Sequence, residues 1–224
     1  MRRLICLTEV DSTNNWLRRR PGLRAYTSVR AELQLAGRGR AERSWFSGSA
    51  GDNLAFSLLL PYDAAGAGRL PAHVAIVLNE ALARWASTRI KWPNDILSGN
   101  RKLAGILCEN YPTMPGLFIV GIGVNVGQRN FPVELEQTAT SLAMLTPCPP
   151  DVRALWLVLT RALWREFRRP RGVAQLLADY NRVAVRYHRR REYPGEVLEF
   201  ATLLSDGRAE FMLADQRLVL DQAS

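Results

Sequence analysis

Histidine and cysteine are scarce in this chain of 224 residues. Only His73 and His188 are present, which leaves little material for a histidine-ligated metal or a serine triad. The three cysteines, Cys6, Cys108 and Cys148, are odd in number and far apart, unlike those of a disulfide framework or a zinc site. We therefore expect all three to be buried thiols, because free cysteine packs as a small hydrophobic residue.

No apolar run in the sequence is long enough to cross a bilayer. The longest extends only from Asn53 to Pro61, and the amino-terminal residues lack the apolar core and small-residue cleavage site of a signal peptide. With 47% hydrophobic residues, the chain can nevertheless bury a large core. We expect a soluble cytoplasmic protein with one main domain and a small appendage.

Lysine is also rare, although the chain is strongly basic. Of the 30 basic residues, only Lys91 and Lys102 are lysines, and the formal net charge is +9. This charge favours an anionic partner such as nucleic acid, a nucleotide or an acidic protein. Where arginine serves as the generic cation, a retained lysine indicates a position that needs a compact ammonium group. Both lysines are therefore candidate functional residues.

The most informative segment is residues 37–45, GRGRAERSW, called here the arginine loop. Its two glycines permit close contacts that a Cβ atom would block, and its three arginines would repel one another without an anion between them. Trp45 adds a flat face on which a purine can stack. The pattern predicts a loop that encloses a phosphate. The alternative is a solvated basic loop with a tryptophan held in the core, because such motifs are short.

Hydrophobic periodicity predicts both strands and helices. Strands are expected at residues 4–8, 26–34, 53–60 and 117–126, the third of them covered on both faces. Helices are expected at residues 13–20, 71–85, 152–167 and 173–183, with Asp151 as the cap of the third. Residues 89–92 and 103–109 flank turn-forming residues and are expected to form one long hairpin.

The composition changes near residue 186. A basic run from Arg189 to Arg191 is followed by short alternating segments around the turns at residues 194–195 and 206–207. We expect residues 1–186 to form the main domain and residues 187–224 to form a small β domain.

Four polar stretches lie beside the apolar strands. They are DSTN at residues 11–14, the arginine loop with Gln34 ahead of it, KWPND at residues 91–95 followed by KLAGIL at residues 102–107, and GIGVNV at residues 121–126. In this order and at these intervals they resemble the motifs of the biotin protein ligases, also called biotin–acetyl-CoA-carboxylase ligases. The resemblance covers residues 8–126 most strongly, and its specificity lies in the combination of the arginine loop, KWPND and KLAGIL.

The resemblance implies a fold and a reaction. The fold is α+β, with a mixed or mostly antiparallel sheet flanked by helices and a small SH3-like β domain at the carboxyl end. The reaction joins biotin and ATP into biotinyl-5′-adenylate with release of pyrophosphate, and the biotinyl group then passes to a lysine of the biotin carboxyl carrier domain of acetyl-CoA carboxylase. Biotin, ATP and Mg²⁺ are the implied ligands. Neither a membrane nor specific DNA is an expected partner, and a homodimer is compatible with the resemblance.

The same motifs imply a biotin site. The ureido ring of biotin presents one carbonyl acceptor and two N–H donors, so its site needs neutral hydrogen-bonding side chains in an apolar cleft. The residues at the family's positions for biotin binding are Ser12, Thr13, Asn14, Gln34, Arg38, Gly39, Arg40, Lys102 and Gly105. Ser12 and Thr13 are equally suited to capping a helix.

An adenylate site is implied as well. Attack of a carboxylate on the α-phosphate brings two anions together, so catalysis depends on positioning and on cationic groups. Asp95 either holds magnesium directly or orients a lysine, and we favour the second role. The catalytic candidates are Lys102, Arg40, Lys91 and Asp95, and the candidates for ATP or adenylate binding are Arg38, Arg40, Arg43, Trp45, Asn94, Lys102 and Asn125.

Two features depart from the family pattern. Glu42 stands where close relatives usually carry glycine, and the carboxyl-terminal β segment is short and very basic. Bifunctional relatives have a helix-turn-helix domain ahead of the catalytic domain, whereas the match here begins at Thr8 and predicts the monofunctional type. The competing interpretations are a lipoate ligase of the same fold and, supported by charge alone, a nucleic-acid-binding module.

Overall fold

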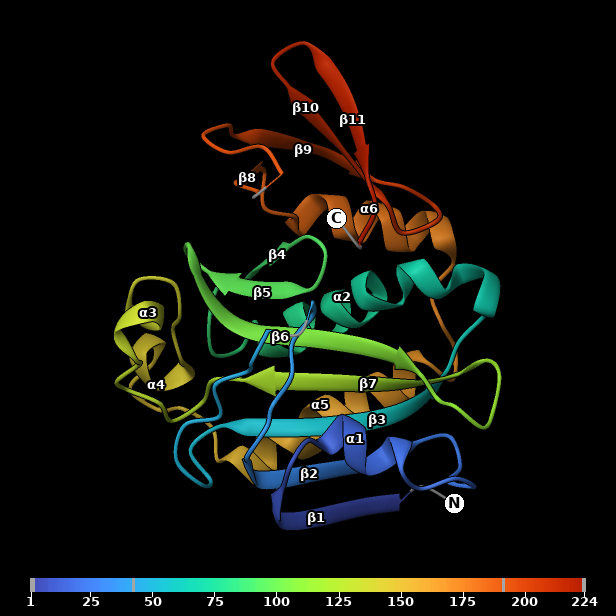
Figure 1. Ribbon diagram of the computed structural model, residues 1–224, viewed down its shortest axis with the longest axis vertical. Coiled ribbons are helices and arrows are strands. Elements are labelled where there is room, and N and C mark those ends of the chain that lie inside the picture. Colours follow the sequence, from blue (N-terminus) through green and yellow to red (C-terminus); the bar gives the residue numbers. More distant parts are fainter. Residues whose placement is uncertain (1–2, 42, 191, 223–224) are drawn as a thin grey trace.

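The computed structural model describes residues 3–41, 43–190 and 192–222. Its strands are β1 (Arg3–Val10), β2 (Thr27–Gln34), β3 (Leu54–Pro61), β4 (Arg89–Lys91), β5 (Asp95–Ser98), β6 (Arg101–Asn110), β7 (Leu117–Val124), β8 (Tyr187–His188), β9 (Leu198–Leu203), β10 (Ala209–Leu213) and β11 (Gln216–Leu220). They form a seven-stranded sheet in the order β1-β2-β3-β7-β6-β5-β4 and a four-stranded sheet in the order β11-β10-β9-β8 (Figure 1). The expected α+β fold with two sheets is confirmed.

The main sheet is mixed. Strands β1 and β2 run parallel, and every other neighbouring pair in this sheet is antiparallel. The central strand β3 is buried from Leu54 to Leu60, as its continuous apolar run predicts for a strand covered on both faces.

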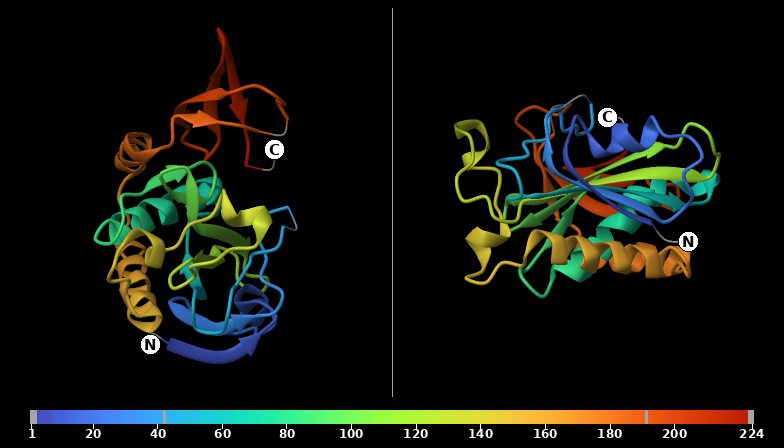
Figure 2. Two further views of the ribbon diagram at one scale, coloured as in Figure 1. Left: turned by 90° about the vertical axis from the view of Figure 1, so that its left-hand side faces the viewer. Right: turned by 90° about the horizontal axis from the view of Figure 1, so that it is seen from below.

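Helices cover both faces of the main sheet. They are α1 (Thr13–Arg18), α2 (Leu70–Leu82), α3 (Val133–Glu136), α4 (Leu142–Leu145), α5 (Val152–Glu166) and α6 (Val173–Val183), with a 3₁₀ helix η1 (Ala64–Arg69) ahead of α2. Helix α1 lies on one face, against β3 and β7, while α2 and α5 pack on the other (Figure 2, right). Among the described residues, no helix is both long and apolar enough to cross a membrane.

The longest helix, α5, follows its sequence pattern closely. The carboxylate of Asp151 accepts a hydrogen bond from the backbone nitrogen of Ala154 at 2.8 Å, which caps the helix. Leu155, Trp156 and Leu159 are buried in the larger of two apolar cores, the one behind the sheet. The smaller core lies under α1, so the face that carries α1 has less apolar covering and leaves room for a site.

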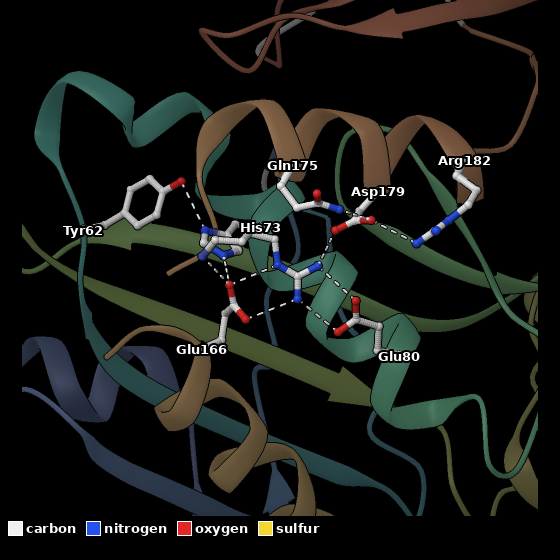
Figure 3. A network of polar contacts seen from close by, with 8 residues as sticks. Tyr62, His73, Glu80, Glu166, Gln175, Asp179 and Arg182 are labelled. Carbon is white, nitrogen blue, oxygen red and sulfur yellow. Dashed lines mark hydrogen bonds and ion pairs between the residues drawn. The ribbon is translucent and has the colours of Figure 1, made fainter. Parts of the chain in front are cut away.

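A polar network joins the helices behind the sheet (Figure 3). Arg171 donates to Glu80, Glu166 and Asp179, which belong to α2, α5 and α6, at 2.9 to 3.0 Å. His73 of α2 also contacts Glu166, at 2.8 Å. Burial alone would raise the pKa of Glu166, but hydrogen bonds from Arg171 and His73 outweigh it and lower that pKa to about 2. The three helices are thus held together by one half-buried carboxylate cluster around a guanidinium.

The expected long hairpin is wrong in its pairing. Strand β5 lies between β4 and β6 and pairs with both, so residues 89–92 and 103–109 are not direct neighbours. The reason is that the segment between them contains two tight turns, separated by Ile96 and Leu97, which are buried. Two buried apolar residues between the turns were enough to form the short strand β5 between β4 and β6.

The expectation of three buried thiols is wrong for Cys6 and Cys148, which are exposed. Cys6 lies on the edge strand β1, whose side chains are mostly solvent-accessible, and Cys148 lies in the loop before α5. Cys108 on β6 is half-buried, and burial raises the pKa of its thiol.

The second sheet begins at Tyr187, and its residues contact the KWPND turn and η1. The indole nitrogen of Trp92, in the KWPND motif, donates to the carbonyl of Gly207 at 3.3 Å, and its ring meets Phe211 edge-on. Gly207 has a φ of +93°, and a Cβ there would lie 2.8 Å from the backbone nitrogen of Arg69. The domain boundary at residue 186 stays a prediction.

Candidate active site

Two adjoining cavities lie on the α1 side of the main sheet, with volumes of about 230 and 270 Å³. They are called here the first and second cavities. Both are lined by Ser44, Trp45, Asp95, Lys102 and Leu135. Every residue that the sequence assigned to the site lines one of them, and only Lys91 and Asn125 are confined to the second.

One end of the first cavity is closed by a cluster of neutral polar groups. Gln34 Oε1 accepts from the Thr13 backbone nitrogen at 2.8 Å and from its hydroxyl at 3.0 Å. Ser57, on the buried strand β3, places its hydroxyl 2.7 Å from Thr13 Oγ1 and 2.6 Å from Asn14 Oδ1. These bonds occupy Gln34 Oε1 and Asn14 Oδ1 and hold both amide groups in one orientation. Within the described part of the chain, Gln34 Nε2 and the Ser12 hydroxyl have no protein partner, so both remain available to a ligand.

The arginine loop folds back on itself along the cavity. The backbone nitrogen of Trp45 donates to the Gly37 carbonyl at 2.8 Å, and that of Gly39 donates to the Arg43 carbonyl at 2.6 Å. A Cβ on Gly37 would lie 2.8 Å from the Trp45 carbonyl oxygen, which explains the glycine at this position. Glu42 lies outside the described residues.

The three arginines of the loop have different surroundings. Arg38 is exposed and pairs with Glu109 of β6, so its charge has an anionic partner within the chain itself. Arg40 is half-buried, and burial, followed by repulsion from Arg43, lowers the pKa of its guanidinium while Asp95 opposes the shift. No carboxylate of the described residues forms an ion pair with Arg40. Its charge, half-buried and without a carboxylate partner in the described part of the chain, is therefore suited to an incoming anion.

Trp45 rests against the sheet in a cradle made by two glycines. Gly105 on β6 and Gly123 on β7 are direct partners in the antiparallel register. A Cβ on Gly105 would lie 2.9 Å from Trp45 Cζ3, and one on Gly123 would lie 2.8 Å from Trp45 Nε1. The indole therefore lies where a larger side chain on either strand would displace it.

Lys102 is held at the boundary between the two cavities. Its Nζ lies 2.7 Å from Asp95 Oδ1 and 5.4 Å from the centre of the Trp45 ring. The backbone of Lys102 is fixed as well, because its amide nitrogen donates to the Thr138 carbonyl at 2.7 Å. Asp95 thus contacts a lysine, and the described residues contain no cluster of three histidine, cysteine or acidic side chains that could hold a metal.

The two asparagines assigned to nucleotide binding spend part of their hydrogen-bonding capacity on the fold. Asn125 Nδ2 donates to the Thr140 carbonyl at 2.9 Å, which leaves its Oδ1 as an acceptor at the second cavity. Asn94 Nδ2 donates to the Ile106 carbonyl at 2.8 Å and so ties the KWPND turn to β6.

Sequence reasoning missed Glu109 and Ser57. Glu109 is four residues after Gly105 on β6, so the two side-chain positions share a face of the sheet. Ser57 is the polar residue within an otherwise apolar strand, and a buried hydroxyl there requires a partner. Strand alternation in the first case and polarity in the second were the available signals.

Known proteins resemble this chain in sequence and structure. The model of the biotin/lipoate A/B protein ligase family matches residues 4–126. The bifunctional ligase/repressor BirA of Bacillus subtilis is 42% identical over 125 residues, which are 52% of this chain and 38% of that protein. The biotin–acetyl-CoA-carboxylase ligase of Paracoccus denitrificans is 38% identical over 132 residues, 56% of this chain and 55% of that protein. The matched parts thus span about half or less of these curated relatives.

The structural similarity extends over nearly the whole chain. The biotin protein ligase of Aquifex aeolicus, solved in complex with biotin and ATP, superposes with a TM-score of 0.82 at 26% identity. The superposition covers 98% of this chain and 96% of that one, so it includes both sheets.

Proposed function

Since the chain belongs to the biotin/lipoate A/B protein ligase family, we propose that it is an ATP-dependent biotin protein ligase. It forms biotinyl-5′-adenylate and transfers the biotinyl group to a lysine of a carrier domain. The Aquifex aeolicus protein with biotin and ATP and the Paracoccus denitrificans ligase support this assignment.

The polar closed end of the first cavity is the observation that carries the proposal. Thr13 and Asn14 line this end and contact Ser57, all three are at most 3% exposed, and Gln34 Nε2 and the Ser12 hydroxyl are free donors. Such an end matches a ureido ring, which offers one acceptor and two donors. The dithiolane ring of lipoate has no such groups and would leave the Ser12 hydroxyl, which is buried, and Gln34 Nε2 without partners, at a cost of about 1–3 kcal/mol for a buried group. This favours biotin over the lipoate ligase alternative.

Adenylation joins two anionic groups beside Lys102. A carboxylate oxygen of biotin attacks the α-phosphorus of ATP, the bond to the β-phosphate oxygen breaks, and pyrophosphate leaves with the electron pair. Lys102, fixed by Asp95, stabilises the charge where the carboxylate meets the phosphoryl oxygens. Arg38, Arg40 and Arg43 of the loop supply further positive charge for the phosphates.

The second cavity suits the adenine. Asn125 presents a free acceptor there for an exocyclic amine, and Trp45 provides an aromatic ring at the boundary. Lys91 lines the same cavity at the end of β4, next to Asp95 in the register. We propose that Lys91 adds positive potential for the nucleotide.

In the transfer step, the amine of the carrier lysine attacks the acyl carbon, AMP leaves, and the amine loses a proton. A wider cavity of about 550 Å³ adjoins the first and shares Arg38, Arg40 and Asn94 with it. We propose that the lysine enters through this cavity and that the carrier belongs to acetyl-CoA carboxylase, as the name of the Paracoccus denitrificans relative indicates for that protein.

The remaining assignments follow from the same chemistry. Mg²⁺ does not fit a site made of protein side chains alone, since Asp95 is paired with Lys102, so we propose that it binds mainly through the phosphates of ATP.

Three free cysteines suit a reducing compartment and support a cytoplasmic location. We propose that this chain binds no specific DNA and can form a homodimer.

A test of the function compares two acids. The protein is incubated with ATP and either biotin or lipoate, and the adenylates are identified by mass spectrometry, with pyrophosphate exchange as the rate. We expect biotinyl-adenylate and little lipoyl-adenylate. A preference for lipoate would contradict the proposal, and a footprint on a biotin-operon promoter that survives competitor DNA would contradict the absence of specific DNA binding.

A further inference from the structure

One carboxylate connects the closed end of the first cavity to the arginine loop. Glu109 Oε2 accepts from Asn14 Nδ2 at 2.7 Å, and Arg38 Nη2 lies 3.2 and 3.3 Å from the two oxygens of the same carboxylate. Arg18 of α1 also donates to Glu109 Oε1. Helix α1 and the arginine loop therefore meet on one side chain of β6.

Glu109 is the nearer of two acceptors that orient the Asn14 amide, the other being the Leu107 carbonyl, to which Asn14 Nδ2 donates at 3.4 Å. With Nδ2 directed to the carboxylate, Oδ1 faces Ser57, whose hydroxyl lies 2.6 Å away. An acceptor-only partner forces this orientation, because a carboxylate has no hydrogen to give to Oδ1. Gly121 provides the room for this amide, since a Cβ there would lie 3.0 Å from Asn14 Nδ2 and closer still to Oδ1. Asn14, which lines the first cavity, is thus held in one orientation, with its acceptor on Ser57 and its donor on Glu109.

Glu109 also anchors one end of the arginine loop. Arg38 is exposed, and among the described residues its guanidinium pairs with no carboxylate other than Glu109. Arg38 lines the first cavity, whereas Glu109 lines only the wider cavity behind it. Glu109 therefore acts on the site through its neighbours.

We propose that Glu109 is a positioning residue that sets the orientation of Asn14 and the resting position of Arg38, so that biotin recognition and loop closure depend on the same carboxylate. The inference rests on the proposed biotin ligase function. Loss of the charge in Glu109→Gln places an amide NH₂ against the donors of Asn14 or Arg38. We expect the KM for biotin to rise by about tenfold or more, the scale of one charge-assisted hydrogen bond, with a smaller change in the KM for ATP.

The experiment uses the full chain and three variants. Glu109→Gln removes the charge, Glu109→Asp keeps it but shortens the side chain, and Glu32→Gln is the matched control. Glu32 is also a strand carboxylate paired with an arginine, Arg30, at 3.3 Å, but it lines none of the three cavities. Titrations with biotin and with ATP give the KM for each substrate. In a separate measurement, trypsin cleaves the ligand-free protein, and mass spectrometry follows the rate of cleavage within residues 37–45.

The expected result is that Glu109→Gln raises the KM for biotin and is cleaved several-fold faster in the loop, that Glu109→Asp lies between it and the parent, and that Glu32→Gln matches the parent. Glu109→Gln combined with Asn14→Ala should bind biotin no worse than Asn14→Ala alone, since the two residues act as one unit. Additive losses, or a parent-like KM and cleavage rate in Glu109→Gln, would overturn the inference. If the parent protein itself adenylates no biotin, the proposed function fails, while the cleavage rates still report on the loop anchor.

Discussion

Replacing Lys102 with alanine tests the catalytic assignment. Its ammonium is fixed by Asp95 at 2.7 Å, it faces both cavities, and its side chain is 35% exposed. Loss of one preorganised charge stabiliser typically slows a reaction by about 10²–10³, or roughly 2.7–4 kcal/mol. Because a third of this side chain is in contact with solvent, water replaces part of its effect. We therefore expect the lower end of the range, about 100-fold.

The assay is pyrophosphate exchange with biotin and ATP at saturation. Lys102→Arg is the informative companion, because a planar guanidinium spreads its charge over a bulky fork and cannot reproduce the compact ammonium that lies 2.7 Å from Asp95 Oδ1. We expect arginine not to restore the rate. The free energy of unfolding should change by less than about 1 kcal/mol in either variant, since partly exposed ion pairs contribute little to stability. Near-normal exchange in Lys102→Ala, or full rescue by arginine, would refute the reasoning.

Three further predictions concern the loop, the glycine cradle and the second sheet. Arg40→Gly should release preformed biotinyl-adenylate about 10- to 100-fold faster and label bystander proteins, because one charge-assisted contact is lost; tight retention of the adenylate would contradict this. Gly123→Ala should displace the Trp45 ring and raise the KM for ATP more than the KM for biotin, and equal rises would argue against the cradle. Burial lowers the pKa of His188 to about 4, so the stability that it contributes above pH 6.5 should fall by about 2 kcal/mol by pH 5. Urea unfolding at pH 7 and pH 5 should show this loss, and His188→Gln should lack it.

The strands and helices with strong periodicity were predictable from sequence. Helix α6 has the expected bounds, and β3 has the expected burial on both faces, because in both cases the apolar pattern alone specifies the packing. The division of residues 89–110 into three strands was not predicted, since Ile96 and Leu97 form too short an apolar run to stand out between two turns. Exposure of Cys6 depends on β1 being the edge strand, which strand order decides and local sequence does not.

The site, like the fold, has features that were predictable from sequence and features that were not. Motif residues distant in sequence, such as Asn14 and Lys102, line one cavity, and their functional roles stay predictions. Their partners were harder to anticipate. Glu109 lies beyond the end of the KLAGIL motif and gains its importance from Asn14 and Arg38, which reach it only in the folded chain. Contacts that join a strand, a helix and a loop are set by tertiary packing, so no local pattern reveals them.

Mass analysis of a biotin carrier domain after incubation with this protein, biotin and ATP tests the central claim most directly. The account predicts that the carrier gains one biotinyl group on a single lysine, that the gain requires ATP, and that Lys102→Ala abolishes most of it. An unmodified carrier under conditions in which an established ligase modifies it fully would contradict the account.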